Sequence, residues 1–311
     1  MFTVVITCHN QAAYIANAVE SALAMTCVDR EIVVIDDASS DRSIHALRRF
    51  GSSIRLLANT VNLGAAQSRN RGAAAAGGRY LVFLDGDDLF LPWALDVYRR
   101  IIERRHPEIL LCRMEFFRGT APVLRFEGFG PELKMAVYPS IAQKDRSYRG
   151  SASAIVVERR VFLTAGGYSD GVFPVECDDL LFKLFESGTT VHILSHPTVS
   201  YRLHESNTVR DVGRFLDGFL KLITIERRGG YPGGSALRLK RRCLMGGPIG
   251  FWVMRGVRTG ERRKAARLLW SGWDMVLAAV VDRVAARLRP RSALESLAAP
   301  LACVGRSVEA L

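Results

Sequence analysis

The first 105 residues of this chain alternate between short apolar runs and stretches whose apolar residues recur at helical spacing. Four runs are rich in branched or aromatic side chains, as buried strands are: residues 2–7, 31–35, 54–58 and 80–84. The stretches between and after them predict helices over residues 12–25, 41–50, 65–76 and 92–104. This alternation predicts an α/β fold with a doubly wound, mainly parallel sheet and helices on both faces.

Beyond residue 105 the pattern loosens. Short strands and Gly/Pro turns over residues 108–148 suggest extra strands and an acceptor-side loop. Further predicted elements are strands at residues 152–157, 191–194 and 198–203 and a helix at residues 178–187 that Gly188 ends.

The last third of the chain is predicted to be helical, basic and amphipathic. Helices dominate after Asn207, so we divide the chain into residues 1–206 and residues 207–311. One predicted helix carries an apolar stripe over Leu269, Trp273, Val276, Leu277, Val280, Val284 and Leu288. Such a stripe either packs on the rest of the fold or lies in a membrane interface, and the sequence leaves both interpretations open.

The formal net charge is +12, and the basic residues crowd between Arg227 and Arg291. A basic excess is typical of proteins that bind nucleic acid, an anionic membrane or phosphorylated substrates. Stacking aromatic residues are not interleaved with these basic residues, and the sequence contains no nucleic-acid-binding motif. We therefore expect no nucleic-acid partner and favour a peripheral membrane contact through the C-terminal region.

The cysteines and the N-terminus indicate in which cellular compartment the protein is expected. The six cysteines are scattered and form no CxxC pair, which indicates free thiols in a reducing compartment. The first apolar run has no charged leader, and no stretch reaches the ~18 apolar residues that a spanning helix needs. We expect a cytoplasmic protein that lies peripherally at the inner face of the cell membrane.

Polar residues directly follow three of the predicted strands. Residues 8–10 follow the first strand, residues 36–41 the second, and Asp85-Gly86-Asp87-Asp88 the fourth. Ligands of doubly wound sheets bind at the carboxyl ends of the strands, so these acidic residues are expected at one edge. Carboxylates this close need cations or hydrogen-bond donors to stay ionised, and hard oxygen ligands suit Mg²⁺ or Mn²⁺ with phosphate oxygens completing the shell. The glycine-rich loops of dinucleotide oxidoreductases and P-loop enzymes are absent, which argues against both classes.

Six segments in succession resemble motifs of the family 2 glycosyltransferases, which have the GT-A fold. They are residues 4–10, with a turn like T-Y-N; residues 33–41, like V-V-D-D-G-S-x-D; residues 62–72, like N-x-G-x-x-x-A-R-N-x-G; residues 84–88, with D-x-D; residues 166–168, like G-G-F; and residues 201–206, like Y-R-x-H-x-x-S. The resemblance covers about residues 2–208.

This resemblance implies roles for individual residues. The nucleotide would be bound by Thr7, Cys8, Asn10, Asp36, Asp37, Asn62, Arg69 and Asp85, with Asp36 or Asp37 on the base. A divalent cofactor, Mn²⁺ or Mg²⁺, would be bound at the diphosphate by Asp87, Asp85 and His204. Arg69 would contact phosphate or form an ion pair with a carboxylate, and a structural role for His204 is the alternative to metal binding.

The sequence departs from the family at the general base, which is usually an Asp that follows a Glu on a loop opening a helix. The corresponding pair here is Glu176-Cys177, so a thiol stands where the carboxylate is expected. Asp178 is the favoured replacement and Glu176 the next, while Asp179 is a third candidate that would instead cap the helix. Without a working base, the chain would be a catalytically impaired homologue that binds a nucleotide sugar.

The reaction implied by the resemblance is inverting transfer of a sugar from a nucleoside diphosphate sugar, commonly a UDP-sugar. The acceptor would be a hydroxyl of a glycan or lipid-linked glycan, in the biosynthesis of cell-surface polysaccharide or glycolipid.

Overall fold

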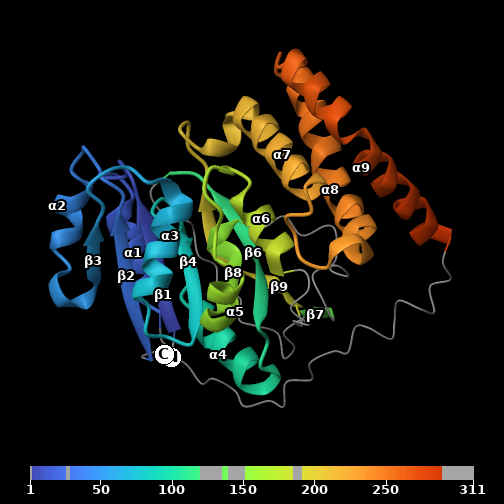
Figure 1. Cartoon of the computed structure of the whole chain (residues 1–311). Coiled ribbons are helices and arrows are strands. Elements are labelled where there is room, and N and C mark those ends of the chain that lie inside the picture. The colour runs from blue at the N-terminus through green and yellow to red at the C-terminus, as the bar shows by residue number, and fades with distance from the viewer. Residues whose placement is uncertain (1, 26–28, 120–134, 139–150, 185–190, 289–311) are drawn as a thin grey trace.

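A mixed β-sheet forms the centre of the computed structural model, which describes residues 2–25, 29–119, 135–138, 151–184 and 191–288 (Figure 1). Nine strands pair within these residues. Their order is β3 (Arg55–Ala58), β2 (Arg30–Asp36), β1 (Phe2–Cys8), β4 (Tyr80–Asp85), β8 (Ile155–Glu158), β6 (Ile109–Phe117), β9 (Val191–Arg202) and β5 (Leu89–Phe90), with β7 (Met135–Tyr138) also paired to β9. The β3-β2-β1-β4 half is parallel throughout, as the sequence predicted.

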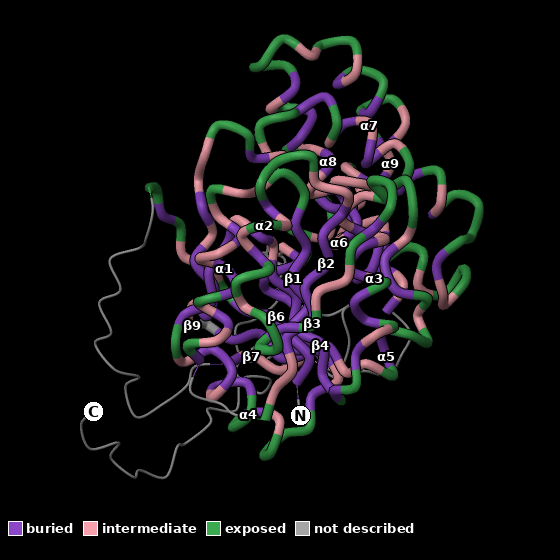
Figure 2. Tube along the Cα trace, turned by 90° about the vertical axis from the view of Figure 1, so that its left-hand side faces the viewer, coloured by how far each residue is buried: buried purple, intermediate pink, exposed green. Residues whose placement is uncertain are grey.

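Helices cover both faces of the sheet because side chains alternate along each strand. Val4 and Ile6 of β1 join a core that contains residues of α1 (Ile15–Leu23), α2 (Ser43–Arg48) and α4 (Ala94–Arg105). Val5 points the other way, into a core with residues of α3 (Gly64–Ala75), α5 (Arg159–Thr164) and α6 (Glu176–Lys183). Figure 2 shows the strands as the buried centre of the molecule. The predicted α/β layers are confirmed.

The strand β9 differs from its prediction. Two short strands were expected at residues 191–194 and 198–203, but Val191–Arg202 forms one strand beside β6. The register between the two strands shifts around Arg113, which lies opposite Pro197. A bulge tolerates a proline that a regular ladder excludes, so the chain crosses this point without leaving the sheet.

Three long helices follow the sheet and lie together (Figure 1). They are α7 (Val212–Arg227), α8 (Gly234–Arg258) and α9 (Arg262–Leu288), and α9 is kinked at Gly272. Single turns of 3-10 helix occur at Gly51–Ser53, Ala152–Ala154 and Thr208–Arg210. Leu216 of α7, Ile249 of α8 and Leu268 of α9 belong to the same apolar core as Val5. The boundary between residues 206 and 207 remains a prediction, and the two parts share one core.

The apolar stripe predicted on residues 269–288 is not the packed face of α9. Its members Leu269, Trp273 and Leu277 are exposed, whereas Leu268 and Met275 on the other side are fully buried. The helix therefore packs through one apolar face and presents a second. Among the cysteines that the structure describes, residues 8, 112, 177 and 243 are free thiols.

Candidate active site

The parallel strands bring the predicted site residues to one edge of the sheet. Cys8 at the end of β1 lies opposite Asp36 of β2, and Thr7 lies opposite Asp85 of β4. The turn after β4 closes tightly, since Gly86 N donates to Thr7 O at 2.9 Å. A Cβ on Gly86 would lie only 2.9 Å from the same oxygen, so glycine is required there. The acidic turns after β2 and β4 thus face a common edge, as the sequence predicted.

The two carboxylates after β2 have different surroundings, although both are buried. Asp37 accepts hydrogen bonds from the backbone N–H groups of Leu63 and Gly64, both at 2.8 Å, and from Asn59 Nδ2 at 2.6 Å. It holds the loop that opens α3. Asp36 Oδ1, in contrast, accepts no hydrogen bond from any residue that the structure describes. A buried carboxylate oxygen without a partner favours a ligand donor, which makes Asp36 the better candidate for contacting a nucleoside base.

Asn10 and Asn62 join the loops around this position. Asn10 Oδ1 accepts hydrogen bonds from the N–H groups of Ser40 at 2.8 Å and Asp41 at 3.3 Å. The amide nitrogens of Asn10 and Asn62 lie 3.1 and 3.0 Å from His9 Nε2. Asn10 has φ 53°, in the left-handed region that asparagine tolerates better than most residues. These two predicted nucleotide-binding residues therefore shape the rim of the site.

His204 follows the end of β9 and lies beside the turn after β4. Its Nε2 lies 2.8 Å from Asp87 Oδ2, its Nδ1 lies 2.9 Å from Ser206 Oγ, and its ring stacks on Tyr14 with centroids 5.0 Å apart. Arg202 Nε donates to Asp87 O at 2.8 Å. Tyr14 was not singled out from the sequence, because an aromatic residue within a predicted helix carries no functional signal. Arg202 belongs to residues 201–206, the segment that resembles the family motif Y-R-x-H-x-x-S.

The neighbouring carboxylates have perturbed pKa values. Burial and the nearby Asp85 raise the pKa of Asp87, against the opposing effect of His204. Asp88 is fully buried, and burial, with Asp87 and Asp85, raises its pKa well above the usual range. It accepts a hydrogen bond from Arg202 N at 3.1 Å, so it anchors β9 to this turn. The unfavourable ionisation of Asp87 is what a bound cation would relieve.

The expected metal group of three residues is not assembled by the side chains. Asp85 Oδ1 accepts from Arg69 Nη2 at 2.5 Å, so its nearest charge is a guanidinium. In the part of the chain that the structure describes, no three His, Cys, Asp or Glu side chains are arranged to hold a metal ion. Asp87 and His204 remain adjacent and offer one carboxylate oxygen and one imidazole nitrogen. These two donors fit a divalent cation whose further ligands are phosphate oxygens.

Arg69 connects this edge to the start of α6. It is buried and pairs with Glu176 Oε1 through Nη1 at 2.8 Å as well as with Asp85. Burial alone would lower the pKa of Arg69, but Asp85 and Glu176 raise it well above its usual value. The structure therefore shows the ion-pair role for Arg69. Arg69 Nε, Glu176 Oε2 and the hydroxyl of Tyr168 are buried and have no hydrogen-bond partner among the described residues, so part of the hydrogen-bonding capacity of this cluster is unused.

The candidate bases lie in the first turn of α6. Glu176 is held by Arg69, and Asp179 is fully buried and accepts a hydrogen bond from Tyr231 Oη at 2.9 Å. Burial and, to a smaller extent, the negative charge of the neighbouring Glu176 raise the pKa of the Cys177 thiol well above its usual value. A thiol in that state is protonated at neutral pH and does not accept a proton. Asp178 is half-buried and is the most accessible of the three predicted carboxylates.

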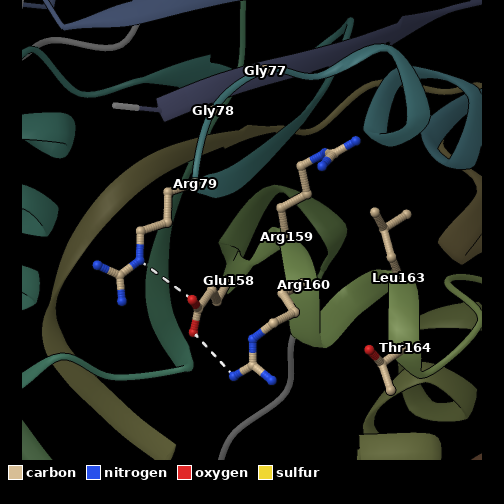
Figure 3. Close-up of a pocket in the computed structure, with 8 residues that line it drawn as sticks. All are labelled: Gly77, Gly78, Arg79, Glu158, Arg159, Arg160, Leu163 and Thr164. Carbon is tan, nitrogen blue, oxygen red and sulfur yellow. Dashed lines mark hydrogen bonds and ion pairs between the residues drawn. The ribbon is translucent and has the colours of Figure 1, made fainter.

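A pocket of about 430 Å³ lies elsewhere, at the opposite end of β4 (Figure 3). It is lined by Gly77, Gly78, Arg79, Glu158, Arg159, Arg160, Leu163 and Thr164. Glu158 already pairs with Arg79 at 3.3 Å, and the N–H groups of Gly77 and Gly78 donate to Glu31. The pocket includes none of the predicted site residues.

Comparison with known proteins agrees with the motifs. Residues 3–146 match the family described as Glycosyl transferase family 2. An uncharacterized glycosyltransferase of Haemophilus influenzae is 26% identical over 209 residues, which span 66% of this chain and 69% of that protein. The succinoglycan biosynthesis protein ExoO of Rhizobium meliloti is 41% identical over 103 residues, 33% of this chain and 29% of ExoO.

A third relative is UDP-Glc:alpha-D-GlcNAc-diphosphoundecaprenol beta-1,3-glucosyltransferase WfgD of Escherichia coli. It is 28% identical over 127 residues, which span 40% of this chain and 50% of WfgD. The matched segments thus cover from under a third to about two thirds of these relatives.

Solved structures of Staphylococcus aureus TarS share the fold. TarS 1–349 in complex with UDP-GlcNAc has a TM-score of 0.67 at 16% identity, covering 89% of this chain and 81% of that one. The complex of the same TarS fragment with UDP has a TM-score of 0.60 and covers 80% of this chain and 70% of that one. The glycosyltransferase relatives and the shared architecture show a transferase of the GT-A fold, and the match over residues 3–146 supports a family 2 glycosyltransferase.

Proposed function

We propose that this chain transfers a sugar, with inversion, from a UDP-sugar to a hydroxyl of a glycan or lipid-linked glycan. One observation supports the proposal: Asp36 and Asp85 end the two parallel strands that flank β1, next to the Asp87–His204 pair, and Arg69 joins Asp85 to the acidic first turn of α6. Arg69 pairs with Asp85 at the end of β4 and with Glu176 on α6, so it fixes these two parts relative to each other.

The relatives support the choice of substrates. The S. aureus protein of the same fold was solved with UDP and with UDP-GlcNAc. The name of the E. coli relative specifies UDP-Glc and a GlcNAc-diphosphoundecaprenol acceptor, and the Rhizobium relative belongs to succinoglycan biosynthesis. We accordingly propose a role in cell-surface polysaccharide or glycolipid biosynthesis, at the cytoplasmic face of the membrane.

On the donor side, each residue has a proposed task. Asp36 Oδ1 accepts a hydrogen bond from the nucleoside base, and Asn10 and Asn62 shape the loops around it. Asp87 and His204 hold a divalent cation, Mn²⁺ or Mg²⁺, which when bound neutralises charge on the departing diphosphate. Arg69 keeps Asp85 and Glu176 in place through its two ion pairs.

On the acceptor side, we propose Asp178 as the general base. The acceptor oxygen attacks the anomeric carbon on the face opposite the diphosphate, and the bond from that carbon to the diphosphate oxygen breaks. The acceptor proton passes to Asp178, which is the accessible carboxylate of this turn. Glu176 is the second candidate, and Asp179 is the third because it is buried against Tyr231.

A catalytically impaired nucleotide-sugar-binding protein is the second candidate function. The observation that favours it is Cys177, whose raised thiol pKa makes it no substitute for a carboxylate. Such a protein would bind the donor without turning it over.

A donor screen tests both functions. Full-length protein is incubated with a panel of nucleotide sugars, with an acceptor mixture and with Mn²⁺ or Mg²⁺, and nucleoside diphosphate release and thermal stabilisation are measured. The transferase predicts metal-dependent release with one donor, which Asp87→Ala abolishes while its fold is retained by circular dichroism. Release that survives in Asp87→Ala would show that the metal assignment is wrong. Stabilisation by a donor without release favours the impaired homologue.

A further inference from the structure

One side of α9 is apolar and open to solvent. It comprises Leu269, Trp270, Trp273, Leu277, Val280 and Val284, which we call the open face. The least exposed of them, Leu269, is 42% exposed, and Trp270 is 83% exposed. Their spacing of mostly three and four residues places them along one side of the helix. Apolar side chains gathered in this way mark an interaction surface more often than isolated ones do.

The neighbouring helix α8 extends this surface. Val276, at the edge of the open face, has its Cγ1 4.0 Å from the position that a Cβ on Gly250 would take. Met254 lies one turn from Gly250 on the same side of α8 and is 56% exposed. The open face therefore continues from α9, the helix at the edge of the helical group, onto α8 (Figure 1).

The surroundings of the open face are strongly cationic. Residues 234–288 contain twelve Lys and Arg but only three acidic residues, and α8 contains no acidic residue at all. Arg258, Arg262, Arg263 and Arg267 are exposed around the turn that joins the two helices. The acidic Asp274 is neutralised by Arg227 and Arg242, at 3.3 and 3.2 Å.

We propose that the open face docks this chain on an anionic lipid bilayer, with α9 lying in the interface. Trp side chains suit that depth because one end of the ring is apolar and the N–H reaches polar groups. Arginines at the border keep their stems on the apolar surface and their charges at the lipid phosphates. None of the helices that the structure describes has both the length and the apolarity needed to cross a bilayer.

Charge also decides between a bilayer and a second copy of this chain. Two copies that met through their open faces would bring their cationic borders together, and like charges at an interface oppose association. An anionic bilayer complements both the apolar face and its border. This inference does not rest on the transfer reaction, because docking requires neither donor nor acceptor.

Vesicle flotation of the full-length protein tests the proposal. The vesicles are phosphatidylcholine alone or phosphatidylcholine mixed with phosphatidylglycerol, and no nucleotide sugar is present. We expect flotation with the anionic vesicles that weakens as salt is raised. The Trp270→Gln/Trp273→Gln variant should bind at least about tenfold more weakly, because each Trp contributes apolar burial. Leu163→Gln is the matched control, since Leu163 is also 42% exposed but lies on α5.

Three outcomes would overturn the proposal. The first is absence of flotation with anionic vesicles, and the second is flotation that the double Trp variant leaves unchanged. The third is a concentration-dependent dimer that the double variant dissolves, which would identify a second copy as the occupant. Iodide quenching of the free protein provides the remaining check, because Trp270 and Trp273 must be accessible before any lipid is added. None of these outcomes depends on whether the enzyme turns over a donor.

Discussion

We expect residue 177 to determine how the acidic turn of α6 works, because the resemblance to family 2 glycosyltransferases places a carboxylate where this chain has a thiol. With Asp178 as the base, Asp178→Asn should lower kcat by about 10²–10⁴-fold, the usual contribution of a general base. Adding Cys177→Asp to that variant should restore part of the activity by returning a carboxylate to the family position. Release of nucleoside diphosphate in the presence of acceptor measures both changes.

The control for this pair is Cys177→Ser, which should retain activity because the protonated thiol is not the base. If Asp178→Asn is fully active while Glu176→Gln is inactive, Glu176 takes the role. If the wild type is inactive and Cys177→Asp alone creates transfer, the chain is the impaired homologue.

His192 makes stability depend on pH. It is a buried residue of β9, and burial, with Arg105 adding to it, lowers its pKa to about 4. Above pH ~6.5 the imidazole is neutral in both the folded and unfolded chain and contributes nothing. As pH falls toward 4 only the unfolded chain takes up the proton, so stability falls, by up to about 3 kcal/mol. Denaturant unfolding at several pH values should show a smaller loss in His192→Leu.

The exposed His45 supplies the control for that measurement, since its ring lies in water in the folded chain. His45→Gln should follow the wild-type pH dependence. An unchanged acid loss in His192→Leu would assign the loss to other groups.

At the residue scale, sequence motifs predicted which side chains would be near one another. They did not predict which hydrogen bonds and ion pairs those side chains would form. The resemblance placed Asp87 with His204, and the structure has them 2.8 Å apart. It did not separate Asp36 from Asp37, because the carboxylate of Asp37 is occupied by N–H groups of a loop that begins some 25 residues later. Nor did it show that the nearest charge to Asp85 is the guanidinium of Arg69. Such choices depend on tertiary contacts.

At the element scale, the packing of α8 on α9 depends on one glycine. A Cβ at Gly246 would lie 1.9 Å from Met275 O, a backbone atom that cannot move alone. Gly246→Ala should therefore destabilise the protein by about 1–3 kcal/mol or more through overpacking. Gly250→Ala, on the same helix, meets only Val276 Cγ1 at 4.0 Å.

Thermal unfolding should show that the two substitutions change the stability of the protein in different directions. Gly250→Ala should be neutral or stabilising by up to about 1 kcal/mol, because alanine favours helix over glycine. Equal effects of the two substitutions would contradict the close approach of the helices at Gly246.

The same close approach explains why the sequence did not identify the packed face of α9. The face that packs includes the small residues Ala265, Gly272 and Ala279, which give a weak apolar signal but allow neighbouring helices to come near. The stronger stripe, with Trp273 and Leu277, is the exposed one. When a helix is apolar on two sides, the pattern of its apolar residues does not indicate which side packs against the rest of the protein. The regular alternation of residues 1–105 had no such ambiguity.

At the scale of the whole molecule, the sheet and the C-terminal helices share an apolar core that includes both Val5 and Leu268. A buried polar contact reinforces the connection, since Tyr231, between α7 and α8, donates to Asp179 of α6. The helical region therefore supports the turn that carries the candidate base.

A shared core predicts that the chain unfolds as one cooperative unit, even though its sequence divides near residue 206. Calorimetry should give a single transition whose van't Hoff and calorimetric enthalpies agree. Tyr231→Phe should lower stability by roughly 1–3 kcal/mol without splitting that transition, because Asp179 loses a buried hydrogen-bond donor. Asp179→Asn and the double variant complete a cycle that isolates the pair. Two separate transitions in the wild type would instead show that the predicted domains fold independently, and Tyr231→Phe would then shift only the transition of the part that it helps to hold.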